Sequence, residues 1–146
     1  MQNKSNYRLV ARIEGDRLMI NAELRDELAR LFDRRMHRIE REVHDPNRRA
    51  HLLSVESERK GDFLLATGSP AAALRAYITA GMWSLDGEYY DWERTQYPAY
   101  LLYLRSRELV RKVKQCASLD PRLGELLKGD KAFHRLADDS DWTEYR

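Results

Sequence analysis

"KGDFLLATGSPAAALRAYITAGMW", Lys60 to Trp83, is the stretch that decides the fold. Apolar residues recur at helical spacing before Gly68 and again after Pro70. Glycine readily adopts the left-handed cap that ends a helix, serine caps a helix N-terminus, and proline is favoured at the first helical position. Gly68, Ser69 and Pro70 therefore predict a tight turn between two antiparallel helices.

Similar signals continue on both sides of this hairpin. Asn21 is a good N-cap for a long amphipathic helix, and the pair Asp45 and Pro46 ends that helix, because the residue before proline avoids the α region. The stretch 84–97, SLDGEYYDWERTQY, interrupts the helical periodicity and is predicted to be a loop, with at most a short turn of helix. The predicted helices occupy about residues 21–44, 47–67, 70–82, 98–117, 120–129 and 131–139.

The N-terminal segment has a different pattern. Tyr7, Leu9, Ala11 and Ile13 alternate with other residues, and a turn signal follows around Gly15. Two short runs around a glycine predict a small N-terminal β-hairpin. A frayed helical or extended arm is the alternative, and the residues leave both open.

Length and composition fit a single helical domain over residues 1–146. The chain has only 7 Gly and 4 Pro, a net charge of +2 and one cysteine, so neither a turn-rich β fold nor a disulfide framework is expected. No signal peptide or apolar run of membrane-spanning length is present, so we expect a cytoplasmic protein with no membrane partner. The acidic tail, 138–146, has the composition of a disordered segment.

Residues 54–87 resemble a tetratricopeptide repeat (TPR), a 34-residue helix–turn–helix. The matching residues are Gly61, Leu64 and Gly68 in the first helix, and Ala73, Tyr77 and Ala80 in the second. Small residues at such positions let two helices approach closely. The pattern departs from the family in two places, where Ser57 replaces a Trp and Leu85 replaces a Pro.

The resemblance implies an all-α fold of antiparallel helical hairpins in a TPR-like array. A single repeat cannot bury its own apolar face, so the helices at 21–44 and 98–117 are expected to pack on either side as degenerate repeats. The alternative is an ordinary αα-hairpin inside an unrelated helical bundle.

The resemblance also implies a groove that binds a peptide of a partner protein. One subgroup of the family holds a terminal carboxylate with Lys and Asn, and this chain has Glu58 and Asp62 at those positions. Two acids would repel a carboxylate and suit a basic or aromatic segment instead. A solvated acidic helix face is the alternative interpretation.

Aromatic residues are concentrated after this hairpin. Tyr and Trp are enriched in interface hot spots, so we predict a partner-binding surface here, although these rings would equally serve to fill one side of a small core. The surface comprises Trp83, Tyr89, Tyr90, Trp92 and Tyr97.

No catalytic motif is recognisable, and Cys116 lies on an apolar helix stripe that suits inert packing. His37, His44 and Glu40 could converge on one helix face, but the neighbouring arginines would oppose a cation. We therefore expect no catalytic residue, no metal and no cofactor, and a protein that is not an enzyme.

Two runs are rich in basic residues. RRMHRIEREVHDPNRRAH, 34–51, holds six Arg against three acids, and RSRELVRKVK, 105–114, holds five basic residues against one acid. Such runs are usually solvated helix faces, but a continuous positive stripe joining them would favour nucleic acid. The sequence thus predicts a non-catalytic protein- or peptide-binding scaffold, with a nucleic-acid-associated protein as the alternative and homo-oligomerisation left open.

Overall fold

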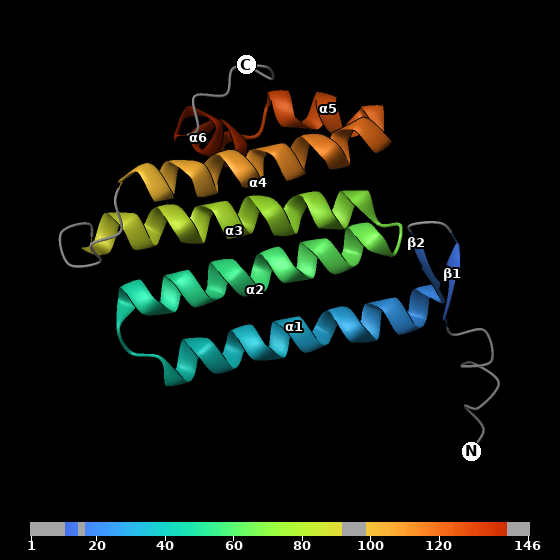
Figure 1. Ribbon diagram of the computed structural model, residues 1–146, viewed down its shortest axis with the longest axis horizontal. Helices are drawn as coiled ribbons and strands as arrows, with labels where there is room; N and C mark the ends of the chain where they lie inside the picture. The colour runs from blue at the N-terminus through green and yellow to red at the C-terminus, as the bar shows by residue number, and fades with distance from the viewer. Residues whose placement is uncertain (1–10, 15–16, 92–98, 140–146) are drawn as a thin grey trace.

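The computed structural model describes the whole chain except residues 1–10, 15–16, 92–98 and 140–146, and it describes side chains over 20–85 and 105–137 (Figure 1). This described part is predominantly helical, as the sequence predicts. Two short strands precede six helices, in the order β1 (Ala11–Glu14), β2 (Arg17–Ile20), α1 (Ala22–Glu42), α2 (Pro46–Ala66), α3 (Pro70–Asp91), α4 (Ala99–Leu119), α5 (Pro121–Lys128) and α6 (Lys131–Asp139).

The two strands pair antiparallel, with Ala11 opposite Ile20 and Glu14 opposite Arg17. They form a two-stranded sheet that lies beside the start of α1 (Figure 1). The earlier part of the alternating pattern, including Tyr7 and Leu9, lies outside the described residues.

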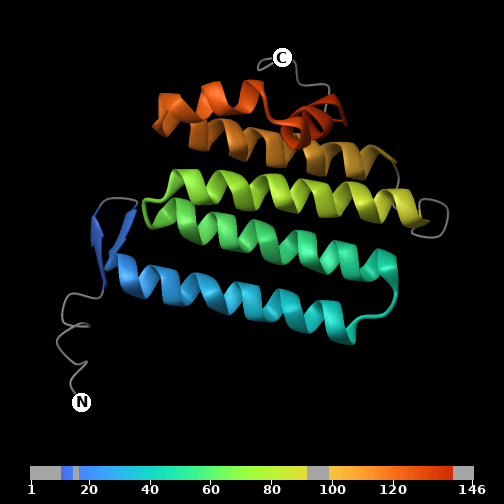
Figure 2. The same ribbon diagram turned by 180° about the vertical axis from the view of Figure 1, so that it is seen from behind.

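Helices α1 to α4 lie side by side in chain order, each antiparallel to the one before it (Figures 1 and 2). The α2–α3 pair makes the most extensive contact, followed by α3 with α4 and then α1 with α2. Helices α5 and α6 cover the far side of α4, and α6 also reaches α3. Among the helices that the structure describes, none is both long enough and apolar enough to cross a bilayer.

The predicted helix boundaries arise from caps that the structure contains. The side chain of Asn21 accepts a hydrogen bond from the N–H of Glu23 at 2.7 Å. Asp45 caps α2, whose first residue is Pro46. Gly68 adopts a positive φ of 86°, which a residue with a Cβ adopts only at a cost. The turn that decides the fold is therefore built by the residues that predicted it.

The core centres on α3. Ala73, Tyr77 and Ala80 are almost completely buried, and they pack among apolar side chains of α2, α4, α5 and α6. Helix α1 contains no buried residue. It therefore forms one edge of the array and is covered on one side only.

Small residues hold α2 and α3 close together, as the sequence predicts. A Cβ atom placed on Gly61 would lie 2.6 Å from Cε1 of Tyr77, closer than packed atoms approach. Ala73 and Ala80 on α3 have no exposed surface. A larger side chain at residue 61 would push the ring, and with it α3, away from α2.

The predicted loop at 84–97 is wrong over its first part, because α3 continues without a break to Asp91. Ser84 and Leu85 are buried, at 8% and 7% exposed. They extend the core-facing side of α3 beyond residue 82, where the apolar periodicity predicted that the helix would end. Their burial in the core outweighs the weak helix propensity of the local sequence. Residues 92–98 lie outside the described part. The first two residues of the predicted disordered tail, 138 and 139, belong to helix α6. The rest of that tail, 140–146, lies outside the described residues.

Candidate functional site

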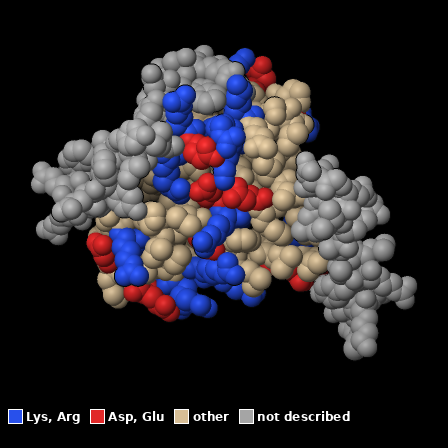
Figure 3. Space-filling view, in the orientation of Figure 1, with Lys and Arg blue, Asp and Glu red and all other residues tan. Residues whose placement is uncertain are grey.

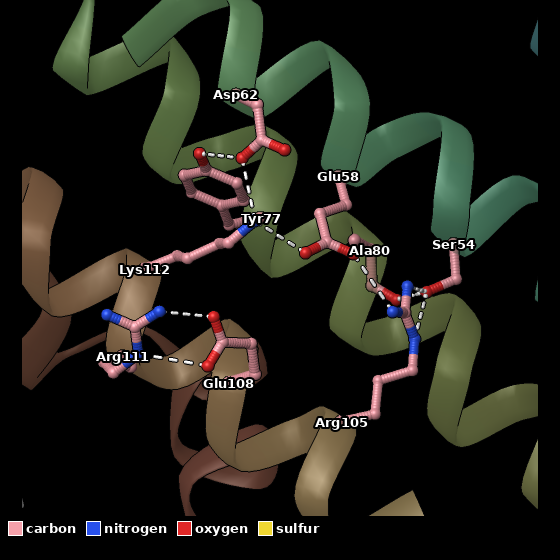
Figure 4. Close-up of polar contacts among 9 residues, drawn as sticks. All are labelled: Ser54, Glu58, Asp62, Tyr77, Ala80, Arg105, Glu108, Arg111 and Lys112. Atoms are coloured by element: carbon pink, nitrogen blue, oxygen red, sulfur yellow. Dashed lines mark hydrogen bonds and ion pairs between the residues drawn. The ribbon is translucent and has the colours of Figure 1, made fainter. Parts of the chain in front are cut away.

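Polar side chains join α2 to α4 across the surface of α3 (Figure 4). On α2 they occur every fourth residue, and on α4 they lie seven residues apart, so each set projects from one face of its helix. We call this group the polar cluster. It consists of Ser54, Glu58 and Asp62 on α2, Tyr77 on α3, and Arg105 and Lys112 on α4.

Lys112 occupies one end of the polar cluster. Its Nζ atom lies 2.7 Å from Oε2 of Glu58 and 2.9 Å from Oδ1 of Asp62. The same ammonium group stands 5.4 Å from the ring centroid of Tyr77, within the range of a cation–π contact. The hydroxyl of Tyr77 donates to Oδ1 of Asp62 at 2.6 Å. One carboxylate oxygen of Asp62 therefore accepts from both neighbours.

Arg105 occupies the other end. Its Nη1 atom donates to Oε1 of Glu58 at 3.0 Å, and its Nε and Nη2 atoms both donate to Oγ of Ser54. That hydroxyl in turn donates to the main-chain carbonyl of Ala80 at 2.7 Å. Glu58 is thus held between two cations, and the two acids of the polar cluster are balanced by two basic side chains.

Tyr77 and Lys112 of the polar cluster keep their protons at neutral pH. Burial raises the pKa of Tyr77, and the hydrogen bond to Asp62 raises it further. Burial alone would lower the pKa of Lys112, but its hydrogen bonds to Asp62 and Glu58 outweigh this and raise the pKa. The phenol therefore stays neutral and the ammonium stays charged, so these two groups suit binding better than proton transfer.

A cleft of about 710 Å³ opens beside Lys112, between the C-terminal ends of α2 and α4 and the start of α3. Its volume falls in the usual range for ligand sites. Asp62, Tyr77 and Lys112 supply its polar wall, and apolar side chains supply most of the rest. We call it the end cleft; it is lined by Asp62, Leu65, Ala66, Gly68, Pro70, Tyr77, Lys112, Gln115 and Leu119.

Leu119 is the most exposed large apolar side chain of the end cleft, at 61%. It lies at the last residue of α4. Among the described residues, Oδ2 of Asp62 accepts no hydrogen bond, because the hydroxyl of Tyr77 and the ammonium of Lys112 both donate to Oδ1. The end cleft is thus lined by an exposed leucine and by a carboxylate whose second oxygen accepts no hydrogen bond from the described residues.

The predicted site residues are distributed between described and undescribed parts of the chain. Glu58 and Asp62 are both in the polar cluster, and Asp62 also lines the end cleft. Trp83 is half-buried on α3 and does not line the cleft. The side chains of the other predicted aromatic residues lie outside the described ones, so that part of the surface stays a prediction. They are Tyr89, Tyr90, Trp92 and Tyr97.

Sequence reasoning missed Arg105 and Lys112, which it assigned to a basic helix face. Their spacing of seven residues puts them on one side of α4, opposite the acids Glu58 and Asp62 on α2. This pairing of basic with acidic residues can be predicted from the sequence only when α2 and α4 are already known to flank α3. Leu119 was also missed, because an apolar residue at a helix end gives no distinctive pattern.

The remaining chemical candidates show no reactive environment. Cys116 is fully buried, and burial raises the pKa of its thiol to about 11. His37 and Glu40 are exposed on α1 beside arginine side chains. Within the described ranges, no three metal-ligating side chains come together.

Comparison with known proteins finds no matching family model, no matching curated protein and no matching solved structure.

Proposed function

We propose that this protein is a non-catalytic module that binds a peptide segment of a partner protein in the end cleft. The observation that carries the proposal is that one cleft is lined by an exposed leucine and by a carboxylate oxygen that accepts no hydrogen bond from the described part of the chain. Leu119 is 61% exposed, and the side chain of Asp62 is 51% exposed on the opposite wall. An apolar side chain and a hydrogen-bond donor on one ligand would satisfy both.

The charges of the end cleft favour a basic segment. The ammonium of Lys112 is already engaged by Glu58 and Asp62, so an acidic ligand would have to compete with two carboxylates for it. Oδ2 of Asp62 is available to a Lys, Arg or main-chain N–H of the ligand. The fitting ligand is therefore a short peptide with a large apolar residue next to a basic one.

The arrangement of helices supports a TPR-like interpretation of this module. Helices α2 and α3 form an antiparallel pair held close at Gly61 and Tyr77, and α1 and α4 extend the row on either side (Figure 1). In this interpretation α2 and α4 are equivalent first helices of successive repeats, and the polar cluster bridges them. Residues 54–87 are the clearest repeat.

Selection from a random dodecapeptide library displayed on phage, with the full chain immobilised, tests the function. The expected result is enrichment of peptides that place Lys or Arg beside Leu, Ile, Phe or Trp. Selection of the same library on the Asp62→Asn variant should lose the preference for basic residues, whereas the preference for apolar residues should persist. Failure to enrich any sequence class, or enrichment that is the same on Asp62→Asn, would contradict the proposal.

A further inference from the structure

A row of arginines follows the exposed side of α1. The residues recur at steps of four, four and three, which keeps them on one face of the helix. We infer that this row, the arginine face, binds the phosphate backbone of a nucleic acid. Its members are Arg30, Arg34, Arg38 and Arg41.

The arginine face is not used for packing. All four of its side chains are exposed, and within the described residues none of them forms an ion pair. Charged residues on the flank of α1 behave differently, because Arg35 pairs with Glu56 at 3.1 Å and Asp33 pairs with Lys60 at 2.8 Å across to α2. The α1–α2 contact therefore engages the flank charges and leaves the arginine face free.

The dimensions and chemistry of the arginine face suit the phosphate backbone of a nucleic-acid strand. From Arg30 to Arg41 the helix rises about 17 Å at 1.5 Å per residue. Part of the face surrounds a shallow depression of about 580 Å³, in which Glu40 is the only acid among the lining residues. Guanidinium groups bind phosphate oxygens in a two-pronged geometry, which an ammonium group cannot provide.

The second basic run does not extend this surface. Arg105 and Lys112 are held by acids of the polar cluster, and Arg111 is paired with Glu108. Helices α2 and α3 separate α4 from α1 (Figure 1). The two runs therefore do not join into one stripe, and the inference concerns α1 alone. Figure 3 shows Lys and Arg side chains along the lower part of the molecule, where α1 lies, with Asp and Glu side chains beside them.

The opposite side of α1 argues for a nucleic acid over an anionic membrane. A membrane-binding helix must bury its apolar side in lipid, but the apolar side of α1 is already engaged by α2. The rings of Phe32 and Phe63 lie 5.8 Å apart, and Met36 accepts a hydrogen bond from Ser57. Leu31, at 41% exposed, is the large apolar side chain that α1 leaves exposed, and one such side chain is a small apolar anchor for lipid. The arginine face alone is sufficient for sequence-independent binding to a phosphate backbone.

The test uses the full chain and fluorescein-labelled 20-nucleotide single strands and duplexes, measured by anisotropy at several salt concentrations. The α1 variant changes all four arginines of the face to Gln. A matched control removes the same charge from exposed cations elsewhere, which also lack an ion pair among the described residues. The control substitutions are Arg75→Gln, Arg107→Gln, Lys131→Gln and Arg135→Gln.

Four phosphate contacts predict a slope of log K against log salt of roughly −3, and an affinity loss on the order of 50-fold between 50 and 200 mM salt. The control variant should keep this slope, and the α1 variant should lose most of it while its circular dichroism is unchanged. Each single Arg→Gln change in the face should reduce the slope by about 0.7 to 0.9.

Three results would overturn the inference. One is the absence of oligonucleotide binding at 50 mM salt. Another is an equal loss of oligonucleotide affinity in the α1 variant and in the control variant. The third is competition in which phosphatidylserine vesicles displace the oligonucleotide at equal phosphate concentration, since this would indicate a membrane surface. None of these results depends on the end cleft, so the peptide proposal stands or falls separately.

Discussion

Gly61 on α2 lies directly against the ring of Tyr77 on α3, and a Cβ atom at residue 61 would be 2.6 Å from Cε1 of that ring. The ring is 1% exposed and is fixed at its other end by the hydrogen bond to Asp62. The closest helix pair and the polar cluster therefore share one side chain. Any change that moves Tyr77 should affect both.

Gly61→Ala is expected to lower the free energy of unfolding by about 1–3 kcal/mol, the usual cost of overpacking a core. The added methyl must displace a rigid ring that is almost completely buried. Urea denaturation followed by circular dichroism measures the change.

Two other glycines provide the comparison for this substitution. At Gly81 an added Cβ would meet the flexible methyl groups of Leu136, and at Gly129 it would meet nothing within 4 Å. The expected order of destabilisation is Gly61→Ala, then Gly81→Ala, then Gly129→Ala, with the last close to zero. If Gly129→Ala costs as much as Gly61→Ala, the close contact of α2 with α3 is not as described.

Gly68→Ala should destabilise the α2–α3 hairpin by about 1–2 kcal/mol, because a φ of 86° brings a Cβ close to the following carbonyl. Gly68→Asn should cost less, since asparagine tolerates this conformation better. Thermal unfolding of the two variants measures the difference. Equal stability of wild type and Gly68→Ala would exclude the left-handed cap.

Removing the ammonium of Lys112 leaves Glu58, whose side chain is only 19% exposed, with one cation in place of two. Lys112→Met is expected to cost about 1–3 kcal/mol, because a poorly solvated carboxylate loses a partner. The loss should be partly recovered in the double variant Lys112→Met with Glu58→Gln, which removes the charge that was left behind.

The neighbouring residue provides a control for Lys112. Arg111 pairs with Glu108 on the surface of α4, where their side chains are 60% and 45% exposed. Exposed ion pairs contribute little, so Arg111→Met should leave the stability nearly unchanged. Equal effects of the two substitutions would mean that the polar cluster is no more than a surface ion pair.

Stability should decline at alkaline pH. Burial raises the pKa of Cys116 to about 11, and the pKa values of Tyr77 and Lys112 are also raised. A raised pKa means that the folded chain holds its proton more tightly, so the contribution is complete below the unfolded pKa and is lost as pH rises toward the folded one. Unfolded cysteine titrates near 8.5, and tyrosine and lysine near 10.

The free energy of unfolding, measured in urea from pH 7 to 11, should therefore begin to fall at about pH 8.5 to 9. In Cys116→Ala the decline should begin about one pH unit or more later, because only the tyrosine and lysine remain. A stability that is constant to pH 11, or an onset unchanged by Cys116→Ala, would contradict the described burial of these groups.

The fold was predictable where the signals are local. Asn21, Asp45 and Gly68 act on backbone groups within a few residues, so their effect can be recognised in the sequence without knowing the fold. The incorrect prediction of a loop at 84–91 arose because the helix there depends on contacts that are distant in the sequence. Ser84 and Leu85 continue the helix because α3 is central and both are buried, and burial is a property of the whole fold.

The candidate site was predictable only in part for the same reason. Glu58 and Asp62 could be selected by their spacing on one helix. Their partners, Arg105 and Lys112, are about fifty residues away in the sequence. Only the packing of α2 and α4 on either side of α3 brings them together, and no local pattern specifies that packing. The end cleft likewise exists because three helix ends meet.

The central claim is that the end cleft binds a peptide, and two exposed leucines test it most directly. Leu119 lines the cleft and is 61% exposed, whereas Leu126 on α5 is 64% exposed and does not line it. Titration of a library-selected peptide by isothermal calorimetry should show Leu119→Ser weakening binding by about 5- to 30-fold, the loss of about 1–2 kcal/mol of apolar contact. Leu126→Ser should bind like the wild type. If both variants bind the peptide equally well, the peptide is held elsewhere and the claim is wrong.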